Sequence, residues 1–271
     1  KVELVLDADG ANGSGTDYLI IKKTGSNGDA EIKNSSNANL FFGTNNTERM
    51  RILSDGKVGI GTNAPAKTLH ISSADNQPLR VESTDAYSGV ELKDNGASTL
   101  PPLISGLSDG FKIYAGHGSS RPEVMSIDAT GAVTMPLQPA FQVHPASTQT
   151  NIASDTTIAF GTERFDLGAD FASNTFTAPV TGKYQMNVLL RLEDIDTAYS
   201  YFRIYLNTSN KQYEWLMDPN FSADLDYLGV GFSILVDMDA SDTSTVAWEH
   251  GGGANQVDIS SASMWTGFLV C

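Results

Sequence analysis

The sequence predicts an all-β protein in two parts, and three observations lead to this expectation. Short runs of alternating apolar and polar residues occur along the 271 residues, for example VELVL, FKIYAG and YFRIYLN, which is the pattern of half-buried strands. No apolar pattern with helical spacing continues for three turns. Aromatic residues concentrate beyond residue 136, where all three tryptophans lie. We therefore expect small sheets over residues 1–138 and a globular β-domain over residues 139–271.

Charge and cysteine content exclude several kinds of partner. The net charge is −15, with 32 Asp and Glu against 17 Lys and Arg, so the chain repels nucleic-acid phosphates and anionic lipid. The single cysteine, Cys271, excludes a disulfide scaffold. No apolar run approaches the ~18 residues of a membrane span, and we expect no membrane insertion. Because the chain begins at Lys1 rather than Met, we expect a longer protein with any targeting signal upstream.

Residues 1–138 are expected to form short strands between turn-forming clusters such as NSSNAN and TGSNGD. A region with few aromatic residues buries little apolar area per residue, at roughly 25 cal/mol per Å². We therefore expect this region to need partner chains to complete a core.

An internal repeat relates two segments of this region at an offset of 75 residues. Each copy is predicted to be a strand, a turn with glycine and a second strand, a unit that can stack along an axis. The matching residues are Gly43, Glu48, Met50, Ile52, Gly56 and Val58 in the first copy, and Gly118, Glu123, Met125, Ile127, Gly131 and Val133 in the second.

The segment ERMRILSDGKVGIGTNAPAKTLHIS, from Glu48 to Ser72, resembles a recurrent segment of bacteriophage tail fibres and related trimeric surface fibres. The resemblance implies an elongated stalk of three intertwined chains, with small residues letting the backbones approach the axis. On this interpretation, two further copies close the core that one copy cannot. The alternative is an ordinary hairpin of a monomeric β-domain.

The C-terminal region carries longer alternating strands at regular spacing, which is typical of a sandwich or jelly roll. Over residues 182–192, for example, apolar residues fall on one face of a single strand. These residues are Tyr184, Met186, Val188 and Leu190.

A second resemblance covers residues 139–271. The residues that carry it are Ala140, Phe141, Phe165, Asp166, Gly168, Phe171, Phe176, Thr177, Ala178, Pro179, Gly182, Tyr184, Gly267 and Phe268. In these residues the region resembles the C1q-like domain, the ten-stranded jelly roll shared with tumour-necrosis-factor ligands. The resemblance implies a head that forms a tight homotrimer, with Phe176, Tyr184, Gly267 and Phe268 as inner residues of the fold and trimer core. The loops over residues 218–229 and 249–258 follow no pattern of the family, so no ligand contact carries over.

The expected recognition surface is formed by the loops EWLMDPNFSADLD, residues 214–226, and EHGGGANQ, residues 249–256. Sugars present apolar C–H faces that stack on aromatic rings, while Asp, Asn and His bind their hydroxyls, and KQYEWLMDPNF and AWEHGGGAN contain this mixture. For Trp215 and Trp248 the alternative is a place in the core, and GGGAN is expected to be a flexible tip. The candidate receptor-binding residues are Trp215, Asp218, Asn220, Glu249, His250 and Asn255.

No cofactor is expected, and the metal content is left open. The histidines show no pair at metal-ligand spacing, although one His from each of three chains could form a zinc site. DADGANG lacks the later ligands of a calcium loop. The family resemblance makes Asp237, Asp239 and Asp242 candidate calcium ligands near a trimer apex. The four histidines are His70, His117, His144 and His250.

Glycan cleavage would need two carboxylates about 5–9.5 Å apart in a cleft. Surface carboxylates are common on so acidic a chain, and no series of β-helical coils is visible, so we expect no enzyme and place a glycan depolymerase last. The candidate sets are Glu193, Asp194 and Asp196; Asp218, Asp224 and Asp226; and Glu249 with Asp258.

Together these patterns predict a homotrimeric phage tail fibre or receptor-binding protein, extracellular on the virion. Its head would recognise a host cell-surface receptor, expected to be a glycan or polysaccharide, and a region upstream of Lys1 would bind other tail proteins. A structural virion appendage such as a head fibre, and a bacterial surface adhesin, remain as alternatives.

Overall fold

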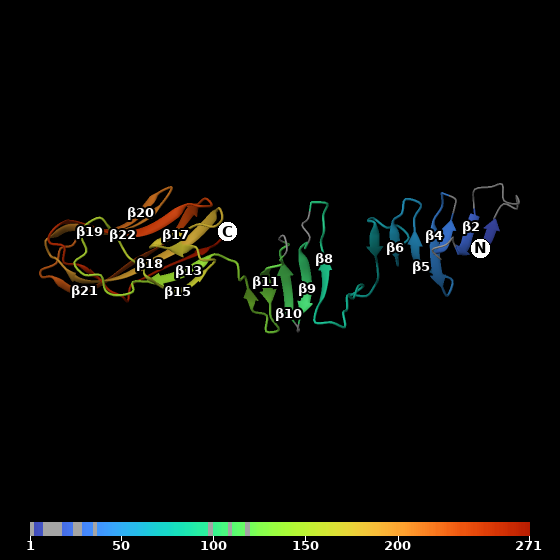
Figure 1. Cartoon of the computed structure of the whole chain (residues 1–271), viewed down its shortest axis with the longest axis horizontal. Coiled ribbons are helices and arrows are strands. Elements are labelled where there is room, and N and C mark those ends of the chain that lie inside the picture. The colour runs from blue at the N-terminus through green and yellow to red at the C-terminus, as the bar shows by residue number, and fades with distance from the viewer. Residues whose placement is uncertain are drawn as a thin grey trace. The chain divides into compact units, whose positions relative to one another are not determined.

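The structure, a computed structural model, describes residues 3–7, 18–23, 29–34, 37–96, 100–107, 110–116 and 120–271 (Figure 1). Every regular element in this part of the chain is a β-strand, which confirms the all-β prediction. No helix among the described residues is long and apolar enough to cross a bilayer. The chain divides into two compact units, Lys1–Ser83 and Thr84–Cys271.

The first unit contains two small sheets. Their strands are β1 (Glu3–Asp7), β2 (Tyr18–Lys23), β3 (Ala30–Asn34), β4 (Leu40–Thr44), β5 (Thr47–Ile52), β6 (Val58–Ile60) and β7 (Leu69–Ile71). β1, β2 and β3 form an antiparallel sheet in chain order. In the second sheet β4, β5 and β6 are antiparallel, and β7 joins β6 in parallel.

One face of the β4–β7 sheet is apolar. The registers form two rows across it, Leu40–Ile52–Val58–Leu69 and Phe42–Met50–Ile60–Ile71. The rows share a face because side chains alternate along a strand with a period of two. Phe42, Ile60 and Leu69 are exposed, Leu69 by 58 %. This single chain therefore leaves much of the apolar face unburied.

The glycines of the VGIGT segment are required by the turn of their own chain. A Cβ on Gly59 would overlap the carbonyl oxygen of Thr62, and one on Gly61 would overlap that of Ser72. Gly59 pairs with Arg51, in the register that faces away from the apolar rows. Local geometry therefore requires both glycines within a single chain, and the expected approach of neighbouring chains at this segment stays a prediction.

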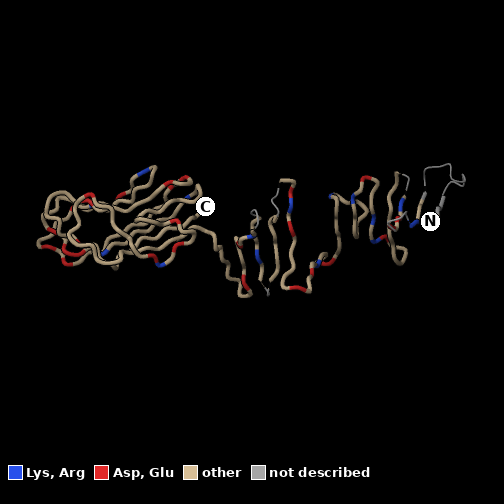
Figure 2. The backbone as a smooth tube through the Cα atoms, viewed as in Figure 1, with Lys and Arg blue, Asp and Glu red and all other residues tan. Residues whose placement is uncertain are grey.

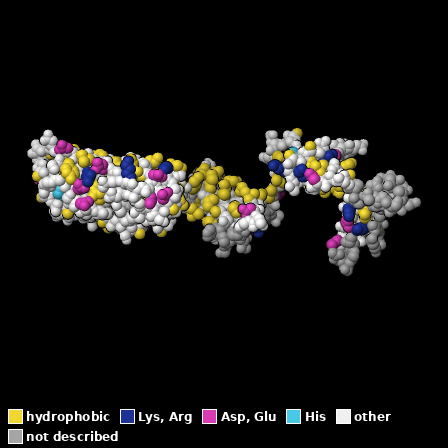
Figure 3. Space-filling view, turned by 90° about the horizontal axis from the view of Figure 1, so that it is seen from above, with side chains coloured by type: hydrophobic (Ala, Val, Ile, Leu, Met, Phe, Trp, Pro, Cys, Tyr) yellow, Lys and Arg dark blue, Asp and Glu magenta, His cyan; other side chains and the backbone are white. Residues whose placement is uncertain are grey.

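The second unit begins with a five-stranded antiparallel sheet. Its strands, in the sheet order, are β12 (Val133–Thr134), β11 (Glu123–Ile127), β10 (Gly110–Tyr114), β9 (Leu103–Leu107) and β8 (Ser88–Glu91). One face carries the rows Val90–Ile104–Ile113–Met125 and Phe111–Ile127–Val133. Figure 3 shows hydrophobic side chains gathered over this sheet, and Val90 and Val133 are exposed.

The predicted repeat is present as two equivalent hairpins. Ile52 pairs with Val58 in the first copy, and Ile127 pairs with Val133 in the second. The turn glycine Gly56 has a φ of +87°, and its counterpart 75 residues later has +89°. The strand before the turn also has a β-bulge at the equivalent place in both copies.

Residues beyond Pro139 form a sandwich of two sheets. The strands are β13 (Ala140–His144), β14 (Thr156–Thr157), β15 (Thr162–Leu167), β16 (Phe171–Ala172), β17 (Thr175–Thr177), β18 (Gly182–Ile195), β19 (Tyr199–Thr208), β20 (Gln212–Met217), β21 (Leu225–Met238), β22 (Thr243–Gly252), β23 (Asp258–Ile259) and β24 (Met264–Leu269). Sheet I has the order β15-β13-β24-β18-β21, with β23 beside β18, and sheet II has the order β16-β17-β22-β19-β20, with β14 beside β22. The chain crosses repeatedly between the sheets, which is the jelly-roll order.

The boundary predicted after residue 138 falls between β12 and β13 and stays a prediction.

The core between the sheets is aromatic. Trp265 meets Phe141 edge-on with ring centroids 5.1 Å apart, and Trp248 stacks on Phe202 at 5.2 Å. Both tryptophans are fully buried, so the core alternative holds for Trp248. Burying a phenylalanine of this kind contributes about 1.5–3 kcal/mol. The predicted inward face of β18 is confirmed by the buried residues Tyr184, Met186, Val188 and Leu190.

Three of the four expected inner residues lie in this core. Phe176 and Tyr184 are buried, and a Cβ on Gly267 would meet the sulfur of Met186 at 2.5 Å. Phe268 is 45 % exposed on the outer face of sheet I. Neighbouring residues of a strand point to opposite faces, so an inward Gly267 directs Phe268 outward. Phe268 therefore lies outside the core of the single sandwich, and its expected place in the trimer core stays a prediction.

Candidate functional site

The outer face of sheet I is a broad surface of apolar and uncharged residues. The registers place Phe268 between Ala140 and Gln185, with Leu167 and Leu235 at the ends of the same row. Both leucines are exposed, Leu235 by 52 %. The three rows across the face are Leu167–Ala140–Phe268–Gln185–Leu235, Phe165–Gln142–Thr266–Asn187–Ser233 and Met264–Leu189–Gly231.

None of the residues in these rows is ionisable, although the chain carries a net charge of −15. At two flanks of the rows, a positive and a negative side chain are paired. Lys183 lies against Asp237 at one end, and Arg191 lies 3.1 Å from Glu193 at the other. An acidic surface repels a second copy of the chain, whereas this face does not. The face is therefore electrostatically suited to contact with an identical chain.

A hydrogen-bonded ladder of uncharged side chains crosses the middle of this face. The Gln185 side-chain amide donates to Ser233 Oγ at 2.8 Å, and Ser233 donates to Asn187 Oδ1 at 2.7 Å. The Asn187 amide then donates to Thr266 Oγ1 at 3.2 Å. The ladder connects β21, β18 and β24 by side chains in addition to their backbone pairing.

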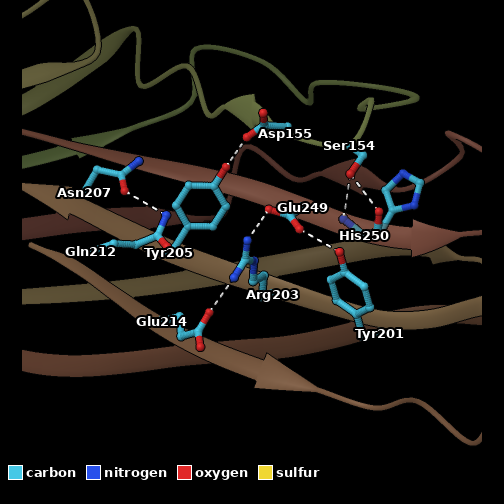
Figure 4. A network of polar contacts seen from close by, with 10 residues as sticks. All are labelled: Ser154, Asp155, Tyr201, Arg203, Tyr205, Asn207, Gln212, Glu214, Glu249 and His250. Carbon is cyan, nitrogen blue, oxygen red and sulfur yellow. Dashed lines mark hydrogen bonds and ion pairs between the residues drawn. The ribbon is translucent and has the colours of Figure 1, made fainter.

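The outer face of sheet II carries a charged network (Figure 4). Arg203 donates to Glu214 at 2.8 Å and to Glu249 at 2.6 Å. The hydroxyl of Tyr201 donates to the other carboxylate oxygen of Glu249 at 2.7 Å. The hydrogen bond from Arg203, followed by that from Tyr201, lowers the pKa of Glu249. Glu249 is thus a fixed member of a network rather than a free loop carboxylate.

The end of the sandwich remote from Cys271 carries several Asp and Glu residues (Figure 2). A recess of about 440 Å³ lies there, where β18 ends and β21 begins. Asp224 accepts hydrogen bonds from Thr197, and the backbone N–H bond, at 2.9 Å, contributes most to lowering its pKa. The N–H of Asn151 donates to Asp258 at 2.8 Å. The lining residues are Thr150, Asn151, Asp194, Asp224, Leu225, Asp226, Gln256 and Asp258.

The glycine-rich loop at the end of β22 is anchored from inside the sandwich. The ring of His250 is hydrogen-bonded to the carbonyl oxygen of Gly252 at 2.9 Å and to Asn255 Oδ1 at 3.1 Å. The N–H of Ala254 donates to Asp196 at 2.6 Å. These contacts connect the loop to the sandwich, and the expected flexibility of its tip stays a prediction.

The expected recognition residues divide between surface and interior. Those with exposed side chains are Asp218, Asn220 and Asn255. Glu249 belongs to the network of sheet II, and Trp215 is partly buried against the core. His250 is only 7 % exposed, with its ring 4.3 Å from that of Tyr199. The expectation that His250 presents its side chain to a receptor is therefore corrected, because its ring supports the loop from below.

Sequence reasoning missed the recess as a unit. It placed its acids in three separate sets, and the structure brings one or more members of each set, Asp194, Asp224, Asp226 and Asp258, to a single wall. Asp194 adopts a φ of +54°, a left-handed backbone conformation that is uncommon for residues other than glycine. Thr150 and Asn151 carry no sequence signal, because only the pairing of distant strands places them there.

Within the described residues, no group of three or more His, Cys, Asp or Glu side chains is placed to hold a metal ion. Two of the three candidate calcium ligands have carboxylates bonded to other groups of the chain. Asp237 pairs with Lys183, and Asp242 accepts the N–H of Asp239 at 2.8 Å. The predicted positions that lie outside the described residues are His117, Gly118 and the DADGANG segment beyond Asp7.

Comparisons with known proteins concern the sandwich alone. No protein-family model matches the chain, and no curated protein matches it. Among solved structures, the chain is similar to the globular domain of the zebrafish complement 1qA protein, with 17 % identity and a TM-score of 0.39 over 49 % of this chain and 98 % of that one. It is also similar to Eiger TNF from S. frugiperda, with 9 % identity and a TM-score of 0.39 over 49 % and 93 % of the two chains. Murine APRIL gives 9 % identity and a TM-score of 0.36 over 49 % and 99 %.

Proposed function

We propose that this chain is a homotrimeric phage tail fibre or receptor-binding protein that recognises a host-surface glycan through its C-terminal sandwich. The observation that carries the proposal is the uncharged, apolar outer face of sheet I. A broad exposed apolar surface on a soluble domain marks an interaction site, and on an acidic chain its absence of charge favours an identical partner. The tail-fibre-like segment Glu48–Ser72 supports a place on the virion, outside the cell.

Self-association also accounts for the small sheets of residues 1–138. The β4–β7 and β8–β12 sheets each have one apolar face with exposed large side chains. Burying such faces against copies of themselves gains roughly 25 cal/mol per Å² of apolar area. Folding and association of this region would then be coupled.

Recognition is assigned to the remote end of the sandwich. The recess there presents carboxylate and amide groups, which are the groups that bind sugar hydroxyls in protein sites. The anchored loop beside it requires little ordering when a ligand binds, which limits the entropy cost. Three such ends on one trimer would give avidity, so weak single-site binding can still hold a particle on a cell.

We infer binding rather than cleavage, so no enzyme activity is proposed. Asp224 and Asp258 already accept hydrogen bonds from their own chain, which suits a fixed recognition surface.

Two measurements on the purified chain test the proposal. Mass photometry should give three times the 28.9 kDa of one chain, and a bacterial-glycan array should retain the trimer on a surface polysaccharide. A stable monomer at micromolar concentration contradicts self-association. A trimer that binds neither glycans nor cells would favour a structural appendage, and release of sugar from a bound polysaccharide would favour a depolymerase.

A further inference from the structure

We propose that the ladder Gln185–Ser233–Asn187–Thr266 on sheet I selects the single way in which copies of this chain pack together. Its occupant is a second copy of this chain. The inference rests on the proposed self-association. It explains why the copies would adopt one arrangement, because apolar contact alone does not select between arrangements.

The contacts of the described residues leave part of the ladder unused. The amide nitrogen of Gln185 donates to Ser233 and to the carbonyl oxygens of Ile234, at 3.2 Å, and Met186, at 3.3 Å. Its Oε1 accepts no hydrogen bond from the residues that the structure describes. Asn187 donates one of its two amide protons to Thr266. The second amide proton of Asn187 and the hydroxyl proton of Thr266 are therefore available to donate hydrogen bonds to another molecule. One chain therefore presents an acceptor and two donors in a fixed order.

These groups lie among apolar neighbours. In the registers, Gln185 stands between Phe268 and Leu235, and the next row beyond Asn187 begins with Leu189. A second copy that covers the apolar residues must also cover the ladder. An unpaired buried donor or acceptor costs free energy, because it loses its bond to water without replacement.

Only some placements of a second copy avoid that cost. In a cyclic assembly one patch of each chain meets a different patch of the next. A placement that lets the unused Oε1 of Gln185 accept, through its two lone pairs, from both Asn187 and Thr266 of the next copy satisfies all three groups. A shifted placement leaves them unpaired while keeping most of the apolar contact. The ladder thus discriminates between arrangements, as a single buried polar residue does in coiled coils.

A different protein is a weaker candidate for the same face. It would have to match an acceptor and two donors in this order, and to avoid the repulsion of a chain with a net charge of −15. The same chain supplies these groups automatically, with no charge in the rows that surround them.

The test converts the ladder to apolar residues in the full chain by Gln185→Leu, Asn187→Val and Ser233→Ala. By mass photometry, the wild-type chain should give one trimer peak. The triple variant should remain associated but lose that single peak to a mixture of species. Ser233→Thr, which keeps the hydroxyl, should retain the trimer. The matched control is Asn207→Val with Gln212→Leu, a pair hydrogen-bonded at 3.1 Å on the outer face of sheet II, and it should leave the distribution unchanged.

Each other outcome is decisive. A single trimer peak for the folded triple variant overturns the role of the ladder and leaves the trimer itself intact. A folded but monomeric triple variant also overturns it, because the ladder would then supply affinity rather than selection. Should the triple variant fail to fold, Asn187→Val alone decides in the same way. A monomeric wild-type chain, with or without another protein captured on the face, removes the proposed function and this inference together.

Discussion

Gly267 and Phe268 are neighbours on β24 that occupy opposite environments. A Cβ on Gly267 would meet both Met186 and Phe141 at 2.5 Å inside the core, while the ring of Phe268 is exposed on the outer face of sheet I. One residue is thus constrained by the fold of a single chain, and the next is free to serve contact between chains. Substitutions at the two positions should separate folding from assembly.

Phe268→Asp is expected to abolish the trimer while the sandwich still folds. The new carboxylate is solvated in one chain, but in the assembly it would be buried without a partner, at a cost of several kcal/mol. Sedimentation measures the assembly, and near-UV circular dichroism of the buried tryptophans reports the fold. Tyr184→Asp is the matched contrast, because it places the charge in the core and should remove cooperative melting. Identical behaviour of the two variants would contradict the assignment of the faces.

Gly267→Ala should destabilise the sandwich by about 1–3 kcal/mol, because an added methyl group overpacks a filled core. Urea denaturation followed by tryptophan fluorescence measures the change. Gly229→Ala is the control, since a Cβ there meets nothing within 4 Å. If both substitutions lower the free energy of unfolding by the same amount, the close packing around Gly267 does not account for the loss of stability.

His250→Ala should lower stability by about 1–3 kcal/mol and weaken glycan binding at the same time. The substitution removes the ring contact with Tyr199 and the two hydrogen bonds that anchor the loop. Thermal melting and glycan-array binding check the two effects. Asn220→Ala, at an exposed position, should leave the melting temperature unchanged. An unchanged melting temperature for His250→Ala would show that the ring does not support the loop, and His250 would again be a candidate for direct receptor contact.

Asp226→Asn and Asp194→Asn should reduce glycan binding several-fold without changing the melting temperature. Both carboxylates line the recess, and an amide keeps the size of the side chain while removing the charge and one acceptor. Asparagine also tolerates the positive φ of Asp194. Glu163→Gln, an exposed substitution on β15, is the control. Full binding by both recess variants would place recognition elsewhere on the chain.

Asp170 and Glu249 should give pH effects of opposite sign. Burial, followed by the charge of Asp166, raises the pKa of Asp170 above its unfolded value of about 3.9. Its ionisation therefore opposes folding at neutral pH, and this cost disappears as the pH falls through the folded pKa. Asp170→Asn should raise the melting temperature at pH 7 and have little effect near pH 3.

The pKa of Glu249 is lowered by Arg203, so its contribution is present above the unfolded pKa of about 4.3 and is lost as the pH falls through the folded value. Glu249→Gln should therefore cost stability at pH 7 and little at low pH. Melting curves between pH 3 and 7 test both variants. A gain of stability at pH 7 from Glu249→Gln would contradict the sign.

Alternation along the chain was sufficient to predict the strands. The inward face of β18 and the paired hairpins of the repeat are local patterns, because a strand determines which of its residues share a face. The family resemblance alone did not separate the core of one sandwich from the trimer core for Phe268, whereas its neighbour Gly267 occupies the inward direction of the strand.

The candidate site could not be predicted in the same way. The recess and the ladder join residues from strands and loops far apart in the sequence, such as Asn151 with Asp258 and Gln185 with Ser233. Their proximity follows from strand order and register, which one sequence does not specify. His250 was misplaced for a related reason, since a strand-end histidine can face either the loop or the solvent until the partner strand is known.

The two equivalent hairpins suggest how this chain can change length over evolutionary time. β4 and β5 connect through a tight turn at Asn45 and Asn46, both with positive φ, whereas β10 and β11 in the second copy connect through a longer segment. At the other end of the same strand, the glycine turn is conserved between the copies in residue type, φ and pairing. A duplicated segment of this kind carries its turn and its strand register with it. Insertions between the copies occur in one of the two connections, the one between the first two strands. Gene copying can therefore add or remove whole units without redesigning their neighbours.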